Sequence, residues 1–474
     1  MGDSKHRNAR RGVTRRELLG AAGAGALAAG ALPLASAARS TRSTRAEYDA
    51  LILGGGFCGV TAARECAKAG LRTLILEARG RVGGRTHTVE WHGATTELGG
   101  TWVHWSQPYV WAEIQRYGLP LVESSGATAR RLIVRRSNGD VAALDAFEHA
   151  EKFARAVAQY MGASREMFPR PHRPFDTGLP EKYDRVTAAE PLARIADPLA
   201  RDLVEGLIAT SVACLPRDAA WVEMVRWYAL AGHDYSDLND AVARYRFRDG
   251  TKALLDAMLA DGKPELRLSA PVASVHQAGE RAIVKTAEGE EIAARAVVST
   301  LPLNVLGDVA WEPALDARKL EASAQRHAGA STKLHVLIEG EHEIACLAPG
   351  DSPLNWLFTD HVAHGQTHLI GFGPSPDRLD IGDPAQVERA VKGWLPDAKV
   401  LDSSGWIWTA DPFARGTWCV LRPGQYSKFL AALQAPAGRV IFASADWANG
   451  WRGFIDGAIE QGIGAARQVR ALLA

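Results

Sequence analysis

Three glycines, Gly54, Gly56 and Gly59, satisfy the pattern G-x-G-x-x-G, which can hold a dinucleotide. The first permits a tight turn, the second lets backbone approach a pyrophosphate, and the third lets a helix pack on a strand. Glu77 follows 21 residues after Gly56, where a carboxylate can bind a ribose hydroxyl. Because 46 glycines in 474 residues make chance matches common, the flanking segments must decide what the pattern means.

The segments around this turn follow the order strand, helix, strand. Residues 50–53 are a short apolar run typical of a buried strand, and residues 73–76 are a second one. Residues 60–69 are predicted to form a helix with Gly70 as its C-cap, so that the helix N-terminus faces the phosphates. The sequence therefore predicts a dinucleotide site, with NAD and FAD equally suitable. The alternative is a glycine-rich turn in another α/β protein.

Two further glycine-rich loops follow the second strand. Residues 80–86 (GRVGGRT) include Gly84 and Arg85, and an arginine here can reach the same pyrophosphate. Residues 97–102 (ELGGTW) form a third glycine turn. The pattern E-A-R-x-R-x-G-G-R-T followed by E-L-G-G-T-W resembles the flavin amine oxidase family, which includes monoamine, polyamine and L-amino-acid oxidases. The resemblance covers residues 48–474 and implies that the dinucleotide is FAD.

The resemblance implies roles for aromatic and acidic residues in the C-terminal half. Asp446 stands where the family usually has a Glu that holds the ribityl or phosphate region, and the helix predicted at residues 456–473 then faces the flavin pyrimidine end. Trp418 and Phe454 stand where family members place two facing aromatic rings. Such rings desolvate an amine and direct its α-C–H toward flavin N5. For any single aromatic residue, core packing is the alternative.

Lys333 matches the family lysine that binds flavin N5 through water and can aid reoxidation, whereas spacing alone favours a solvated strand-edge lysine. The residues predicted to be catalytic are Lys333, Trp418 and Phe454. The residues predicted to bind the cofactor are Gly54, Gly56, Phe57, Cys58, Gly59, Glu77, Ala78, Arg79, Gly84, Arg85, Gly99, Gly100, Thr101, Trp102, Val272, Trp408, Asp446, Phe454 and Ile455.

The cysteines bear on how the flavin is held. Family members with covalent flavin have a cysteine at the position of Thr417, so its replacement implies non-covalent FAD. Cys419, two residues on, leaves a covalent link as a minor alternative. The five cysteines form no C-x-x-C and no zinc-type spacing with histidine, so we expect free buried thiols and no metal site.

Residues 1–47 look unlike the rest of the chain. A twin-arginine pattern at residues 14–19 (TRRELL) precedes the mildly apolar stretch 18–34, and residues 35–37 (ASA) form a cleavage signal. Together these predict a twin-arginine signal peptide at residues 1–37, a linker at 38–47 and a periplasmic or extracytoplasmic location. A disordered basic tail is the alternative. No other run reaches spanning length, so no membrane anchor is expected.

The predicted fold is α/β, a Rossmann-like FAD-binding domain interleaved with an α+β substrate domain, as in the amine oxidase fold. The predicted FAD-binding segments are 48–129, 265–310 and 437–474. The predicted substrate-domain segments are 130–264, which is mainly helical, and 311–436, in which residues 406–408 (WIW) are expected to be a strand. The net charge of +1 gives no support for nucleic-acid binding.

These features predict an FAD-dependent amine oxidase or dehydrogenase. Hydride would pass from the α-carbon of a neutral amine to flavin N5, the imine would hydrolyse, and O₂ or a c-type cytochrome would accept the electrons. Within the family, the stretches 99–108, 323–330, 411–425 and 449–462 are most similar to the pseudooxynicotine and nicotine branch of bacterial amine oxidases. That similarity implies a secondary N-methylamine such as pseudooxynicotine as substrate, and Phe454 disfavours nicotine itself.

Alternatives remain open. An L-amino-acid oxidase would need an arginine to clamp the carboxylate, and the candidates are Arg226, Arg244, Arg246 and Arg248. A polyamine oxidase is a second alternative within the family. Outside the enzymes, the chain would be a non-catalytic exported flavoprotein for electron transfer. The sequence leaves open a homodimer.

Overall fold

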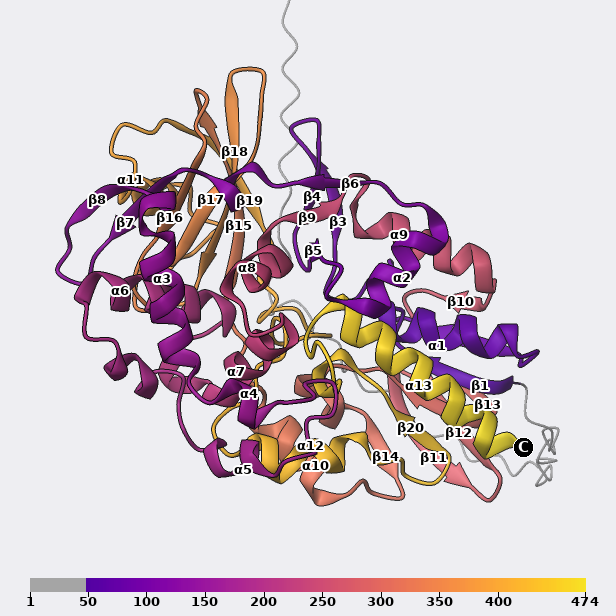
Figure 1. Cartoon of the computed structure of the whole chain (residues 1–474). Helices are drawn as coiled ribbons and strands as arrows, with labels where there is room; N and C mark the ends of the chain where they lie inside the picture. The colour runs from indigo at the N-terminus through magenta and orange to yellow at the C-terminus, as the bar shows by residue number, and fades with distance from the viewer. Residues whose placement is uncertain (1–47) are drawn as a thin grey trace, which may run out of the picture. The chain divides into compact units, whose positions relative to one another are not determined.

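The computed structural model describes residues 48–474, which belong to one compact unit. The predicted signal peptide (1–37) and linker (38–47) lie outside the described residues. Two sheets dominate the described part, one of eight strands and one of seven (Figure 1). The structure confirms the predicted α/β class, whereas the predicted domain boundaries stay predictions.

The eight-stranded sheet has the order β10-β2-β1-β13-β12-β11-β14, with β20 beside the end of β13. Its strands are β1 (Tyr48–Leu53), β2 (Thr73–Leu76), β10 (Glu265–Arg267), β11 (Val272–Ala278), β12 (Arg281–Thr286), β13 (Glu291–Ser299), β14 (Ala310–Glu312) and β20 (Val440–Phe442). β1, β2, β13 and β20 run parallel, so their carboxyl ends meet at one edge. Three distant stretches of sequence therefore converge there, where ligands of open α/β sheets bind.

The helices packed with this sheet include α1 (Phe57–Lys68), α2 (Pro108–Tyr117), α9 (Gly250–Gly262) and α13 (Ile455–Leu473). α1 lies along α13, and the two can approach closely because a Cβ on Gly462 would lie 2.5 Å from the backbone oxygen of Cys58. α1 starts at Phe57, three residues before the predicted start. α9 falls within the segment predicted for the substrate domain, yet it packs on α1.

The seven-stranded sheet has the order β19-β15-β18-β17-β16-β7-β8 and is antiparallel except where β16 meets β7. Its strands are β7 (Arg131–Arg135), β8 (Val141–Asp145), β15 (Thr332–Glu339), β16 (Ile344–Leu347), β17 (Trp356–Ala363), β18 (Gln366–Gly373) and β19 (Val400–Gly405). The mainly helical stretch predicted from residue 130 thus begins with a hairpin. The strand predicted at 406–408 is wrong: β19 ends at Gly405, and the Trp408 N–H turns back to the Trp406 carbonyl.

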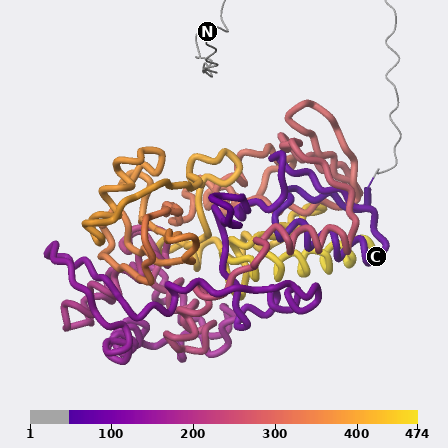
Figure 2. The backbone as a smooth tube through the Cα atoms, turned by 90° about the horizontal axis from the view of Figure 1, so that it is seen from above, coloured from indigo at the N-terminus to yellow at the C-terminus, as the bar shows by residue number. Residues whose placement is uncertain are grey.

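After the β7–β8 hairpin, most of the segment predicted to be mainly helical (130–264) is helical. Its helices are α3 (Ala146–Met161), α4 (Ser164–Met167), α5 (Leu179–Tyr183), α6 (Pro198–Ser211), α7 (Trp221–Leu230) and α8 (Tyr235–Ala243). All ten residues of α7 are buried, including Glu223 and Arg226, whose charged groups lie 3.6 Å apart. Figure 2 shows indigo, salmon and yellow segments together on one side and the orange segment of the seven-stranded sheet on the other.

Three further α-helices and five further strands remain in the described chain. They are α10 (Ala317–Gln325), α11 (Pro384–Lys392), α12 (Gln425–Gln434), the hairpin β3 (Thr88–Trp91) with β4 (Ala94–Glu97), and the small sheet of β5 (Trp102–Val103), β9 (Tyr245–Phe247) and β6 (Leu121–Glu123). None of the helices in residues 48–474 combines the length and apolar character that crossing a membrane requires.

Candidate active site

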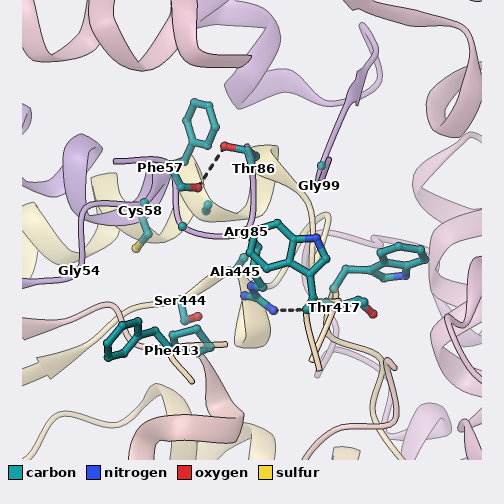
Figure 3. A pocket seen from close by; sticks show the side chains of 18 of the residues that line it. Gly54, Phe57, Cys58, Arg85, Thr86, Gly99, Phe413, Thr417, Ser444 and Ala445 are labelled. Carbon is teal, nitrogen blue, oxygen red and sulfur yellow. Dashed lines mark hydrogen bonds between the residues drawn. The ribbon is translucent and has the colours of Figure 1, made fainter. Parts of the chain in front are cut away.

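A cavity of about 460 Å³ runs from the glycine turn after β1 to a group of aromatic side chains beside the seven-stranded sheet. Segments 53–102, 270–309, 408–418 and 444–458 all contribute to its walls. In Figure 3, Gly54 and Phe57 lie toward one side of the cavity, and Arg85 is hydrogen-bonded to Thr417. The parallel-strand edge and the aromatic group therefore open into one continuous space.

The glycine turn has the backbone geometry that the motif predicts. Gly54 has φ +108°, which favours glycine, and a Cβ on Gly59 would lie 2.0 Å from the Gly54 oxygen. Gly59 therefore packs the start of α1 against the turn and does not itself line the cavity, whereas Gly54 and Gly56 do. The N-terminus of a twelve-residue helix stands at the cavity wall and can stabilise a pyrophosphate.

Glu77 lies at the end of β2, on the cavity wall. One carboxylate oxygen accepts from the Gly55 N–H at 2.7 Å, and the other accepts from the Arg79 N–H at 2.8 Å. The carboxylate is thus fixed in place by backbone donors, and its remaining lone pairs can receive hydroxyl groups. This arrangement fits the predicted ribose contact.

Arg85 and Asp446 form an ion pair at the cavity wall, in which Asp446 is buried and Arg85 is partly exposed. Arg85 Nη2 lies 2.5 Å from Asp446 Oδ1, while Nη1 donates to the Thr417 carbonyl at 2.6 Å. The second Asp446 oxygen accepts from the Leu303 N–H at 2.8 Å. Burial alone would raise the pKa of Asp446, but Arg85 and its other neighbours hold it below its usual value. Arg85 lines the cavity and Asp446 does not, so Asp446 acts on the cavity through Arg85.

The other cavity arginines are also paired. Arg79 forms an ion pair with Asp411, and its Nε lies 3.3 Å from the second Asp411 oxygen. Arg415 pairs with Asp308 at 2.9 Å. The cavity therefore keeps its arginines near the dinucleotide end, each oriented by its own carboxylate.

Trp418 and Phe454 both line the aromatic end, as predicted. Trp418 Nε1 donates to the Ser211 carbonyl at 3.0 Å, and its ring meets Phe372 at 6.2 Å. The Phe454 ring meets Trp227 edge-on at 4.7 Å between centroids. The backbone segments that carry these two residues lie close together, since a Cβ on Gly453 would lie 3.3 Å from the Trp418 Cβ.

Three further aromatic residues of this end were not identified from the sequence. Trp227 comes from α7, and Trp356 and Phe372 face each other across β17 and β18. All ten residues of α7 are buried, so the pattern of apolar residues along this helix does not show that Trp227 faces a cavity. The cross-strand pair could have been inferred only from the register of two strands.

Lys333 lines the cavity from β15 and is buried. Its Nζ donates to the Glu97 carbonyl at 2.8 Å, the Gly99 carbonyl at 2.8 Å and Thr101 Oγ1 at 2.5 Å. Burial lowers the pKa of Lys333 to about 7, with Glu97 and Asp360 acting in the opposite direction. These acceptors use all three ammonium hydrogens, so the predicted water-mediated contact with flavin stays a prediction.

The structure brings together nearly all the residues predicted to bind cofactor or substrate. The exceptions are Gly59 and Asp446, which lie directly behind the wall. The predicted residues that line the cavity are Gly54, Gly56, Phe57, Cys58, Glu77, Ala78, Arg79, Gly84, Arg85, Gly99, Gly100, Thr101, Trp102, Val272, Lys333, Trp408, Trp418, Phe454 and Ile455.

The four arginines considered as partners for an amino-acid carboxylate lie outside the cavity wall. Arg226 is buried and donates to the Gly450 carbonyl, and the other three pair with carboxylates. None of the four, Arg226, Arg244, Arg246 and Arg248, lines the cavity.

The cysteines of the described chain are all free and buried. Thr417 lines the cavity, whereas Cys419 lies outside its wall and burial raises the pKa of its thiol. Residues 48–474 contain no cluster of His, Cys, Asp or Glu suited to a metal ion. A helix N-terminus, a fixed carboxylate and paired arginines along one elongated space fit a flavin dinucleotide, with its ring system at the aromatic end.

Comparisons with known proteins agree with this geometry. The sequence profile described as "Flavin containing amine oxidoreductase" matches residues 57–470. The chain is 39% identical to a pseudooxynicotine dehydrogenase of Pseudomonas sp., covering 100% of this chain and 99% of the relative. It is 35% identical to a nicotine dehydrogenase of Pseudomonas putida, covering 98% of each.

Solved structures show the same fold. A putrescine oxidase with bound putrescine superposes with a TM-score of 0.76 at 21% identity, covering 90% of this chain and 99% of the other. A cyclohexylamine oxidase from Brevibacterium oxydans gives a TM-score of 0.75 at 20% identity, again covering 90% and 99%. The resemblance inferred from the glycine loops and the C-terminal motifs is confirmed: the chain belongs to the flavin-containing amine oxidoreductase family.

Proposed function

We propose that this enzyme binds FAD non-covalently and oxidises an uncharged secondary N-methylamine of the pseudooxynicotine type. The observation that carries this proposal is the aromatic end of the cavity, which adjoins the dinucleotide end. The residues that line it include Trp227, Trp356, Phe372, Trp418 and Phe454. The names of the two Pseudomonas relatives support a nicotine-derived amine.

The aromatic end favours the neutral form of an amine. Burial among apolar rings disfavours charge and lowers an amine pKa, which frees the nitrogen lone pair. Trp418 and Phe454 then orient the amine so that its α-C–H points at the cofactor. When bound, the flavin supplies a hydride acceptor at N5. The oxidised substrate carries a C=N bond, which water hydrolyses to a carbonyl compound and a smaller amine.

Amino acids and polyamines fit the aromatic end less well. An amino acid would need a cation for its carboxylate, but the cavity arginines Arg79, Arg85 and Arg415 are all paired and belong to the dinucleotide end. A polyamine would need an anion for its distal ammonium. The acidic residues that line the cavity are Glu77, held by backbone donors, and Asp308, paired with Arg415.

Anaerobic bleaching of the visible flavin band tests the substrate class. The purified holoenzyme would be mixed with pseudooxynicotine, nicotine, simple monoamines, putrescine and L-amino acids under argon. We expect rapid bleaching with pseudooxynicotine and slow or no bleaching with the others. Faster bleaching by an amino acid or by putrescine would replace this substrate proposal with the corresponding alternative.

The attachment of FAD is tested by acid precipitation. Thr417 offers no thiol at the position of covalent attachment, and Cys419 lies outside the cavity wall. We therefore expect trichloroacetic acid to leave the yellow colour in the supernatant. A yellow pellet that turns colourless in a Cys419→Ser variant would show a covalent link through that thiol.

The electron acceptor is proposed to be a c-type cytochrome, with O₂ as the alternative. Both Pseudomonas relatives are named dehydrogenases, which supports an acceptor other than O₂. Enzyme reduced anaerobically by substrate would be mixed with O₂ or with oxidised c-type cytochrome in a stopped-flow instrument. Reoxidation faster with O₂ than with cytochrome would reverse the assignment.

Export through the twin-arginine pathway is proposed from residues 14–19 and 35–37. A double Arg15→Lys, Arg16→Lys variant should remain in the cytoplasm when the full chain is expressed and the cells are fractionated. Equal periplasmic amounts of variant and unchanged protein would contradict this proposal.

A further inference from the structure

A second hollow lies on the surface of the seven-stranded-sheet side, away from the active-site cavity. It has a volume of about 190 Å³ and shares no lining residue with that cavity. We call it the arginine hollow, and its defining residues are Arg135, Arg378 and Arg389 around it and Leu354, Leu379 and Trp394 among its apolar wall.

Three separate elements bring the arginines together. Arg135 ends β7, Arg389 lies on α11, and Arg378 lies in the connection between β18 and α11. A Cβ on Gly393, after α11, would lie 3.0 Å from Arg135 Nη1, so the glycine leaves room for this guanidinium. Arg378 Nη1 donates to the Asp351 carbonyl at 3.2 Å, which orients the side chain while leaving its other donors unused.

The three guanidinium groups have no carboxylate partner in residues 48–474. Acidic side chains near these segments have other partners: Asp202 pairs with Arg136, and Glu388 pairs with Lys392. Asp383 accepts from the backbone N–H groups of Ala385 and Gln386 and from the Gln386 side chain. Arg389 helps to lower the pKa of the Asp383 carboxyl but forms no ion pair with it. Three positively charged side chains that line one hollow, none of them in an ion pair within residues 48–474, attract an anion.

The composition of the wall indicates what kind of anion fits. Guanidinium groups bind carboxylate and phosphate groups in bidentate geometry. Leu354, Leu379 and Trp394, all buried, give the same hollow an apolar side. We propose that the arginine hollow binds a small organic anion that carries carboxylate or phosphate groups on a short apolar body.

The arginine hollow is connected to the substrate cavity through one short segment. Leu354 lines the hollow, and the backbone N–H of the next residue, Asn355, donates to the Phe372 carbonyl at 2.7 Å. Trp356 follows directly in the sequence. Phe372 and Trp356 both line the aromatic end of the cavity. An occupant of the hollow therefore contacts the segment that positions two substrate-facing rings, and its presence is expected to change the KM for the amine.

Calorimetric titration of the holoenzyme tests the site. The probes are 4-methylpentanoate and butyl phosphate as anions on a short apolar body, inorganic phosphate as a bare oxyanion, and sodium chloride at matched ionic strength. We expect saturable binding of at least one organic anion with a stoichiometry of one, tighter than inorganic phosphate. Binding of an anion should also change tryptophan fluorescence, and a Trp394→Phe variant should lose most of that change.

Variants separate a built site from general charge. Arg389→Gln should weaken binding of the organic anion by about tenfold, as expected for loss of one charge-assisted contact. Arg131→Gln is the matched control, because Arg131 is exposed on the same strand as Arg135 but does not line the hollow. Its binding constant should stay within about twofold of the unchanged protein.

Four results would overturn the proposal. They are no saturable binding at matched ionic strength, equal weakening by Arg389→Gln and Arg131→Gln, binding of inorganic phosphate as tight as that of both organic anions, and an unchanged amine KM at saturating anion. The first two would mean an adventitious ion only, the third a bare oxyanion site, and the fourth a site without influence on the cavity. The calorimetric titrations contain no amine, so their outcome does not depend on which amine the enzyme oxidises.

Discussion

The indole Nε1 of Trp418 donates a hydrogen bond to the backbone carbonyl of Ser211 at 3.0 Å. Ser211 is the last residue of α6, and carbonyls in the last turn of a helix lack intrahelical partners. The Ser211 hydroxyl is itself bonded to the Leu207 carbonyl. One tryptophan therefore ties the C-terminal motif to the end of a helix from the middle of the chain.

Two replacements of Trp418 distinguish the contribution of its aromatic ring from that of its hydrogen bond. Trp418→Ala removes both and should lower kcat/KM by about 100-fold, because misplacing a bound amine by an ångström can cost that much. Trp418→Phe keeps an aromatic face and should lose less. Steady-state kinetics measure the effect, and the ratio of flavin to protein absorbance should stay near normal in both variants.

A matched control for this change is Trp406→Ala. Trp406 lies on a nearby loop, is 37% exposed and does not line the cavity. Its replacement should leave kcat/KM within about twofold. If Trp418→Ala and Trp406→Ala behaved alike, the aromatic cage proposed for Trp418 would be wrong.

Asp446→Asn should weaken FAD binding through Arg85. The change removes the counter-ion of the Arg85 guanidinium, which is 19% exposed at the cavity wall, while the shape of the side chain is kept. Breaking a fully buried pair costs roughly 3–5 kcal/mol, and we expect a smaller loss for this partly exposed one. Reconstitution of the apoprotein, followed by quenching of FAD fluorescence, should give a markedly weaker Kd. Asp308→Asn is the control, since its partner Arg415 is more exposed. Equal Kd values for Asp446→Asn and unchanged protein would show that Arg85 needs no carboxylate.

The dinucleotide end could be predicted from the sequence because its signals are local. The glycine turn, Glu77 and Arg85 lie within 32 residues, and glycine spacing directly reports backbone geometry. The predicted role of Asp446 is less direct than the motif implied. The structure places its carboxylate behind Arg85, and no one-dimensional pattern tells which of two residues on distant loops faces a cavity.

The aromatic end was only partly predictable because it depends on tertiary register. Trp356 and Phe372 meet because β17 pairs with β18 in one particular alignment, and a slip of one residue would turn both away. The error at residues 406–408 has a similar origin. The run W-I-W has strong strand propensity, but the chain turns at Trp406 so that Trp408 can donate to the Leu98 carbonyl at 2.9 Å.

Lys333 should make the free energy of unfolding depend on pH between about pH 7 and 10. Burial lowers its pKa in the folded state to about 7 from an ordinary value of 10.5. Between these values the unfolded chain holds a proton that the folded chain has lost, so stability rises as pH rises from about 7 to 10. Thermal unfolding of Lys333→Met should lack this rise, while the exposed-lysine control Lys428→Met should keep it. Parallel pH profiles for all three proteins would mean that Lys333 keeps an ordinary pKa.

Asp456 should give the opposite pH dependence of the free energy of unfolding, and Asp456→Asn tests it with little change in side-chain shape. One carboxylate oxygen, Oδ1, accepts from the backbone N–H groups of Tyr109 at 2.7 Å and Val110 at 2.9 Å, at the start of α2, while Oδ2 is buried without a partner. Burial raises the pKa of Asp456 to about 7 from 3.8. The unfolded chain therefore loses its proton first, and stability falls as pH rises from about 4 to 7 and stays low above.

Asp456→Asn keeps the single accepting oxygen and puts an uncharged amide in place of the unpartnered one. The variant should match the unchanged protein near pH 4 and be more stable above about pH 7, by at most about 4 kcal/mol for a shift of this size. Asp383→Asn is the control, because Asp383 caps α11 in solvent and hydrogen bonds lower its pKa. That variant should instead be less stable than the unchanged protein above about pH 4, and the difference should shrink as pH falls below 4. A stability difference for Asp456→Asn that does not change with pH, measured by denaturant unfolding of the holoenzyme, would show that Asp456 is ionised throughout.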